Sequence, residues 1–165
     1  MLFRSDSGTL DNDDITNINT ASVSGTAEAG SSIALTSDVD GAVGSATADG
    51  SGDWSITTAA LSDGTHALTS TATDTAGNTS AASAALTITV DTAAPAAPSA
   101  ADLAAASDSG TLDDDDITNI NTASVSGTAE AGSSIALTSD VDGAVGSATA
   151  DGPGEIGRAA CRESV

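Results

Sequence analysis

The sequence predicts an all-β protein built from tandem antiparallel β-sandwiches, of which the second is truncated. Three observations support this fold class. Short apolar runs alternate with polar residues and are separated by glycine-containing turns. No segment of useful length has the 3.6-residue periodicity of an amphipathic helix. Residues 5–50 recur as residues 107–152 and are identical at 45 of 46 positions, the exception being Asn12, which becomes Asp114.

The expected strands lie between residues 20 and 91, and Leu86–Val90 has the clearest two-residue alternation. Asp-Gly and Gly-Asn pairs separate the runs, because Gly adopts positive φ at little cost. Each large apolar side chain contributes roughly 1.5–3 kcal/mol when fully buried. The core is small, so we expect marginal stability without a bound ion or a stacked neighbour. The expected core residues are Val23, Ile33, Leu35, Val43, Trp54, Ile56, Leu61, Leu68, Leu86, Ile88 and Val90.

The two ends differ in character from the rest of the chain. The tail from Glu155 to Val165 resembles the translation of a sequencing adapter, departing only at Ala160 and Ser164, and the first five residues resemble the opposite adapter end. A genuine C-terminal tail is the alternative. The expected organisation is an adapter-derived end (1–5), an acidic segment (6–19), a complete domain (20–92), an Ala- and Pro-rich linker (93–107), a truncated second repeat (108–152) and an adapter-derived tail (153–165).

The truncation removes every counterpart of Trp54–Val90, which is roughly the second half of a sandwich. We therefore expect the second repeat to have open strand edges and not to be stable alone.

Composition excludes several functions. The formal net charge is −21, which argues against binding to nucleic acid or to anionic lipid. No stretch approaches the roughly 18 apolar residues of a membrane span. One Cys and one His leave no disulfide framework and no multi-histidine metal site.

No catalytic constellation is present, so the chain is predicted not to be an enzyme. His66 is expected to be packed or on the surface, and Trp54 to be in the core rather than stacked on a sugar.

Several motifs, in the same order, resemble the bacterial immunoglobulin-like repeats that build the stalks of giant secreted adhesins and biofilm matrix proteins. The resemblance covers residues 6–98 and again 108–152. It departs at His66, where such repeats usually carry Tyr. The motifs are Val23–Gly30, Ala48–Gly50 with Asp53–Ser55, Asp63–His66, Ala72–Ser80, and Ile88–Thr92 leading to Pro95.

The clustered carboxylates predict a cation site. Adjacent carboxylates repel one another, so a folded loop that holds them favours a cation, and calcium takes six to eight oxygen ligands in flexible geometry. The resemblance implies calcium between modules, because Asp74, Asn78 and Asp91 lie near the far end of a module in the family's topology. The alternative is that these residues only solvate the protein and make turns, as expected for Asp38, Asp40, Asp49 and Asp53. The candidate ligands are Asp6, Asp11, Asp13, Asp14, Asn17, Asp74, Asn78, Asp91, Asp108, Asp113, Asp115, Asp116 and Asn119.

The resemblance implies a structural function: a stalk fragment of a large bacterial cell-surface adhesin that projects a distal binding domain and is stiffened by calcium. The implied location is extracellular or on the cell surface. The expected partners are neighbouring modules of the same chain and a host or bacterial surface glycan or protein. The alternatives are a carbohydrate- or cell-binding module and an accessory region of a large secreted enzyme.

Overall fold

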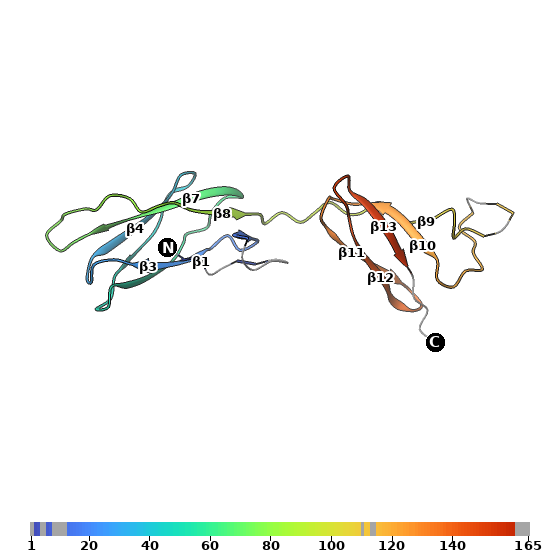
Figure 1. Cartoon of the computed structure of the whole chain (residues 1–165), viewed down its shortest axis with the longest axis horizontal. Helices are drawn as coiled ribbons and strands as arrows, with labels where there is room; N and C mark the ends of the chain where they lie inside the picture. Colours follow the sequence, from blue (N-terminus) through green and yellow to red (C-terminus); the bar gives the residue numbers. More distant parts are fainter. Residues whose placement is uncertain (1, 4–5, 8–12, 110, 113–114, 161–165) are drawn as a thin grey trace. The chain divides into compact units, whose positions relative to one another are not determined.

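The computed structural model of the chain contains two units, Met1–Ala93 and Ala94–Val165 (Figure 1). It describes residues 2–3, 6–7, 13–109, 111–112 and 115–160. The elements in this part of the chain are all strands, which confirms the all-β prediction. Within the same residues there is no helix with the length and apolar character that a membrane crossing requires.

The first unit is a sandwich of two sheets. The smaller sheet has the order β1-β3-β6, and the larger has the order β2-β8-β7-β4-β5. Pairing is antiparallel except between β2 and β8, which run parallel. The strands are β1 (Leu2–Phe3), β2 (Ile15–Thr16), β3 (Ser22–Thr26), β4 (Ser32–Ser37), β5 (Gly41–Thr47), β6 (Asp53–Thr57), β7 (Gly64–Thr73) and β8 (Leu86–Val90).

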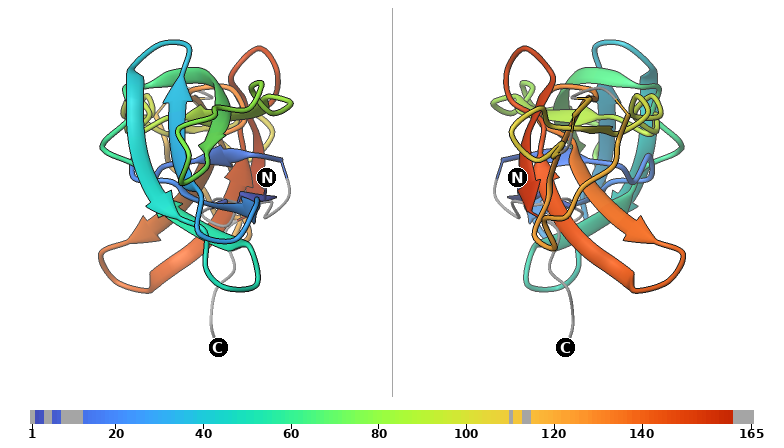
Figure 2. Two further views of the ribbon diagram at one scale, coloured as in Figure 1. Left: turned by 90° about the vertical axis from the view of Figure 1, so that its left-hand side faces the viewer. Right: turned by 90° about the vertical axis from the view of Figure 1, so that its right-hand side faces the viewer.

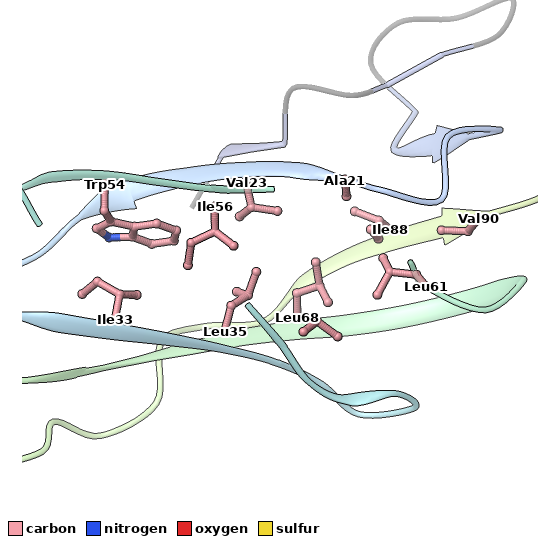
Figure 3. Packing of buried hydrophobic residues seen from close by; sticks show 11 residues of the cluster. Ala21, Val23, Ile33, Leu35, Trp54, Ile56, Leu61, Leu68, Ile88 and Val90 are labelled. Carbon is pink, nitrogen blue, oxygen red and sulfur yellow. The ribbon is translucent and has the colours of Figure 1, made fainter. Parts of the chain in front are cut away.

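The core of the first unit fills the space between its two sheets (Figure 3). Trp54 and Ile56 of β6 face Ile33 and Leu35 of β4. Exposed and buried residues alternate strictly along β4 and β6, because successive side chains of a strand point to opposite faces. Trp54 is only 6% exposed. The prediction that it is a core residue is therefore confirmed.

Gly25 allows Trp54 to lie flat against β3. The two residues are directly paired across β3 and β6. A Cβ atom on Gly25 would come within 2.6 Å of the indole atom Cζ2. The largest core side chain therefore depends on a glycine in the neighbouring strand.

The second unit repeats only part of this sandwich. Its strands form a three-stranded sheet in the order β13-β10-β9 and a hairpin of β11 and β12, drawn in orange in Figure 2. They are β9 (Asp102–Leu103), β10 (Ser124–Thr128), β11 (Ser134–Ser139), β12 (Gly143–Thr149) and β13 (Glu155–Ala160). The described part of this unit contains no counterpart of β7 or β8.

The division between the two units falls after Ala93, beside the expected start of the linker. Part of the expected linker packs in the second unit, where β9 pairs with β10 and the amide of Ser99 donates to the carbonyl of Thr128 at 2.8 Å. The expected tail supplies β13, in which Ile156 pairs with Gly127 as Trp54 does with Gly25. Ile156 is thus an apolar residue at the position that Trp54 occupies in the first unit, and the backbone ladder itself does not depend on side-chain identity.

The contact between Gly25 and Trp54 gives the first testable prediction. Replacing Gly25 with Ala should destabilise the first unit by about 1–3 kcal/mol, the usual cost of overpacking a core. Gly127→Ala is the matched control, because the nearest atoms to a Cβ there are the movable side-chain atoms of Ser99 and Ile156 at 3.1 and 3.3 Å, and the nearest backbone atom is at an ordinary contact distance of 3.6 Å. Denaturant unfolding monitored by Trp54 fluorescence measures the first unit. Equal stability of the G25A variant and the parent chain would contradict the prediction.

Candidate functional site

The acidic segment at the start of the first unit forms a compact loop. The backbone amide of Asp14 donates to Asp6 Oδ2 at 3.2 Å, and the amide of Ile15 donates to Asp13 Oδ1 at 3.1 Å. Ser7 Oγ donates to Asn17 Oδ1 at 2.9 Å and accepts from the Asn17 amide at 3.0 Å. Asp14 has a φ of +58°, a left-handed conformation that Asp tolerates better than most residues. Four of the predicted ligands therefore lie in one loop.

This loop is attached to the last strand of its own unit. The amide of Thr89 donates to the carbonyl of Asp14 at 2.8 Å, and the amide of Asp91 donates to the carbonyl of Thr16 at 2.9 Å. Asp91 immediately follows β8, where the chain leaves the first unit. The described ligand candidates of the acidic segment, Asp6, Asp13, Asp14 and Asn17, thus lie with Asp91 at the exit end of one module.

The second unit forms the same loop. Asp108 Oδ2 accepts from the Asp116 amide at 3.3 Å, and Asp115 Oδ1 accepts from the Ile117 amide at 3.2 Å. Ser109 Oγ donates to Asn119 Oδ1 at 2.9 Å, and Asp116 has the same φ of +58° as Asp14. No β8 is present beside it in the described residues. The loop conformation is therefore set by its own sequence.

Asp74 and Asn78 lie elsewhere. They form a turn after the last residue of β7, in which Asp74 Oδ2 accepts from Asn78 Nδ2 at 2.8 Å. Asp91 lies past the other end of that sheet, where Gly64 pairs with Val90. The ten residues of β7 place these two ends roughly 30 Å apart at about 3.3 Å per residue. The structure therefore does not bring Asp74 and Asn78 together with Asp91.

The acidic loops have some of the features of a cation site but not all of them. Asp6 Oδ1 and Asp108 Oδ1 are buried without a hydrogen-bond partner within the described residues. A buried carboxylate oxygen without a partner costs free energy that a cation would recover. The described residues contain no group of three His, Cys, Asp or Glu side chains arranged for a metal ion. Calcium also takes carbonyl and amide oxygens, and Asp11 and Asp113 lie outside the described residues.

A second polar cluster surrounds His66, which is completely buried. Its Nε2 lies 2.7 Å from the carbonyl oxygen of Ser62, and its Nδ1 lies 2.9 Å from Ser37 Oγ. A carbonyl oxygen can only accept, so Nε2 carries the proton and Nδ1 accepts from the Ser37 hydroxyl. Ser37 Oγ also accepts from the amides of Val39 and Asp40 at 3.1 and 3.2 Å. His66 is thus a packed core residue that fixes a turn.

This cluster contains Ser, His and Asp side chains but does not form a catalytic triad. Asp40 Oδ2 lies 3.5 Å from Nδ1 of His66, the same nitrogen that contacts Ser37. A triad requires the carboxylate and the hydroxyl on opposite ring nitrogens. Ser37 and His66 are also buried away from any substrate.

Hydrogen bonds lower the pKa of two carboxyl groups. The backbone amide of Ser62 is the main cause of the lowered pKa of Asp40, and the Ser62 hydroxyl adds to it. The Asn78 side chain is the main cause of the lowered pKa of Asp74, followed by backbone amides of the turn. These carboxylates, together with Asp49, which accepts from the amides of Ser51 and Asp53, stabilise turns.

An open groove of about 490 Å³ lies at the end of the first unit away from the acidic loop. Its lining is mainly hydroxyl-bearing and small residues of β7 and the following segment, and it also includes Glu28 and Asp74. Trp54 contributes to the floor but is too buried to present a ring face to a sugar. The groove therefore lacks the stacking platform that a carbohydrate site would need.

The fold and its repeated acidic loops define a class of protein: tandem immunoglobulin-like β-sandwich modules. A family model described as bacterial Ig-like domain matches residues 1–92 and again residues 94–159. The two matches span nearly the whole chain, and the chain belongs to this family of bacterial Ig-like domains. The resemblance found in the sequence motifs is confirmed.

Among solved structures, the chain is similar to one described as a biofilm associated protein, BSP domain. The identity is 18% and the TM-score is 0.34, over 92% of this chain and 24% of that chain. This chain therefore spans about a quarter of the length of that protein. No curated protein matches the sequence.

The hydrogen bonds from Ser62 to Asp40 give a pH prediction. The folded-state pKa of Asp40 lies below its usual value of 3.8, so its stabilising contribution is complete above that value and is lost as the pH falls through the folded pKa. Asp40→Asn should therefore lower stability at pH 6 and have a smaller effect near pH 3. Urea unfolding at both pH values measures this.

Asp142→Asn is the control for this prediction. Asp142 occupies the same position in the second copy, whose described residues contain no counterpart of Ser62. This variant removes the same charge and should cause no comparable pH-dependent loss in the unfolding free energy of the first unit. An effect of D40N that is the same at pH 6 and pH 3 would contradict the assignment.

Proposed function

We propose that the chain is a stalk segment of a large repetitive bacterial cell-surface adhesin, whose modules project a distal binding domain and are stiffened by calcium. Membership in the bacterial Ig-like family supports a structural module rather than an enzyme. The observation that carries the proposal is the acidic loop, repeated in both units and attached in the first unit to the strand from which the chain leaves the module.

The position of the loop suggests how calcium would act. Asp6, Asp13 and Asp14 would supply carboxylate oxygens, and Asp91 lies beside the loop at the start of the segment that leaves the unit. A bound cation would neutralise carboxylates that otherwise repel one another and would tie this segment to the module. In this proposal each module holds its own ion at its exit end, and Asp74 and Asn78 are not ligands of it.

The composition fits an extracellular polyanion. Residues 6–152 contain no Cys, Lys or Arg, so stability there depends neither on disulfides nor on ion pairs with basic side chains. Neighbouring modules of the same chain are the proposed partners of this segment, and a surface glycan or protein would be the ligand of the distal domain. Direct glycan binding by these modules is the alternative, and the burial of Trp54 weighs against it.

Calcium binding should raise the melting temperature of the chain. A ligand at 100 times its dissociation constant adds about 2.7 kcal/mol to the stability of the folded state. Thermal unfolding with and without millimolar calcium, together with titration calorimetry, measures the effect. The absence of both a melting shift and a bound ion would rule out calcium at these loops.

The variant D6N/D108N should abolish most of the calcium-induced shift, because it removes one ligand charge from each loop. It keeps the side-chain oxygen that can accept from the Asp14 and Asp116 amides. The control D53N/D140N removes two charges from exposed positions outside the loops and should retain the shift. Equal loss of the shift in both variants would point to general charge screening instead.

Calcium should also slow the independent tumbling of the two units. NMR relaxation separates two linked bodies from one elongated body, because the latter gives longer and more anisotropic correlation times. Signals from residues 53–92 report the first unit, and signals from residues 155–160 report the second, since these segments lie outside the duplicated stretch. Unchanged correlation times at saturating calcium would remove the stiffening part of the proposal.

A further inference from the structure

The chain leaves the first unit through β8, which is bordered on one side by β2. The amide of Thr89 donates to the carbonyl of Asp14 at 2.8 Å, and the amide of Asp91 donates to the carbonyl of Thr16 at 2.9 Å. β8 then leads directly into the segment that connects the two units (Figure 1). The backbone is therefore held by β2 up to the residue where it leaves the sheet.

The other side of the same segment is held by the side chain of Asp63. This residue directly precedes β7, and its Oδ1 accepts from both the amide of Thr92 at 3.1 Å and the hydroxyl of Thr92 at 2.8 Å. Gly64, the first residue of β7, pairs with Val90. Consecutive amides of a strand point to opposite edges, so the amide of Thr92 points to the β7 side. The carboxylate of Asp63 therefore extends the support of β8 past its last backbone pair with β7.

The direction of pairing decides how this strand responds to tension. Among the described residues of the first unit, β2 and β8 are the one parallel pair, and the other paired strands are antiparallel. β2 is reached from the N-terminal side and β8 leads to the C-terminal side. Tension therefore pulls the start of β2 and the end of β8 in opposite directions along one axis, and the hydrogen bonds between them are strained together. In an antiparallel pair these two points would lie at the same end, and the bonds would open one at a time.

We propose that the β2–β8 pair, extended by the contact between Asp63 and Thr92, is the element that bears tension in the first unit. We call residues 14–16, 89–92 and Asp63 the exit clamp. The proposal rests on the proposed stalk function, because a stalk between a cell and a distal binding domain carries tension. The hydrogen bonds of the exit clamp join protein groups directly, so the clamp bears load without a bound cation.

The segments that precede β2 are held by fewer contacts. β1 has only two paired residues. Ser7 contacts Ile15 and Asn17 through three local hydrogen bonds, the longest of which runs from the Ser7 amide to the Ile15 carbonyl at 3.3 Å. These contacts lie before the exit clamp in the path of the force, so they open first and leave the clamp loaded. A cation in the acidic loop would delay this first step and would not replace the clamp.

Single-molecule force spectroscopy in EDTA tests the exit clamp without a bound cation. The full chain is held by its two ends at constant force, and the lifetime of the folded first unit is measured, because forced unfolding is governed by the unfolding rate. The two units are distinguished by length, since residues 13–92 release roughly 290 Å of chain and residues 99–160 roughly 220 Å at about 3.6 Å per residue.

The variant Asp63→Ala removes the acceptor of two hydrogen bonds and should shorten this lifetime at least about threefold. Asp63→Asn keeps a side-chain oxygen that can accept from Thr92 and should retain most of the lifetime. Asp53→Ala removes the same charge at an exposed position outside the clamp and should not shorten it. Thr89→Pro removes the amide that donates to Asp14 and should also shorten the lifetime at least about threefold.

Two controls separate tension from general stability. Gly25→Ala lowers equilibrium stability but should leave the lifetime under force within about twofold of the parent, because the core is still packed when the clamp opens. The second control moves the C-terminal handle to Ala76→Cys in a chain that carries Cys161→Ser. Thr92 is then outside the path of the force, so Asp63→Ala should lose most of its effect.

Parent-like lifetimes of both D63A and T89P would overturn the proposal. A shortening by G25A as large as that by T89P would also overturn it, as would an effect of D63A that is the same with either handle. Calcium binding at the acidic loops is measured separately by the melting shift. A missing melting shift would therefore remove the calcium part of the proposed function and leave the result in EDTA unchanged.

Discussion

The pairing of β7 with β4 is the interaction on which the first unit depends. It brings Leu68 over Leu35 and places His66 where it can close the Ser37 turn. Among the described residues, β8 pairs with β7 and β2, and β2 carries the acidic loop to the exit end. In the larger sheet, β7 is therefore positioned by β4, β8 by β7, and the acidic loop by β8. The described part of the second unit has no counterpart of β7, and the same inner-face residues are only half-buried there.

The two copies separate what the local sequence determines from what tertiary context determines. The β4–β5 and β11–β12 hairpins have the same register, including the irregularity after Leu35 and Leu137. The acidic loops also share their hydrogen bonds and the left-handed Asp. Both features therefore arise within the duplicated residues. Burial of Ile33 and Leu35 does not, because it also requires side chains from outside these residues, among them Trp54, Leu68 and Ile88.

This difference explains how far the sequence could be interpreted. Two-residue alternation is a local signal, so the strands containing Ile33, Trp54 and Ile88 could be predicted together with the core. Which strands become neighbours is not encoded in alternation, so the contact of Asp91 with the acidic segment of its own module was not predicted. The hydrogen bond between His66 and Ser37 was also missed, since it joins residues 29 positions apart. The one sequence signal at this position was that His66 stands where such repeats usually carry Tyr.

Duplication of nearly identical modules creates a problem of partner choice, because β7 fits β4 and β11 equally well by sequence. In residue numbers, 27 positions separate Ser37 from Gly64, and 61 separate Thr73 from Ser134. Loop-closure entropy grows only as (3/2)RT ln n, so the shorter connection is favoured by about 0.7 kcal/mol. Chain distance alone is therefore a weak determinant of correct pairing.

The opposite sheet of the sandwich provides a stronger determinant. The first unit has Trp54 across from β7, whereas the second unit has the smaller Ile156 at the matching register position. Burial of the larger aromatic surface stabilises the native choice, and it is Gly25 that makes room for the ring.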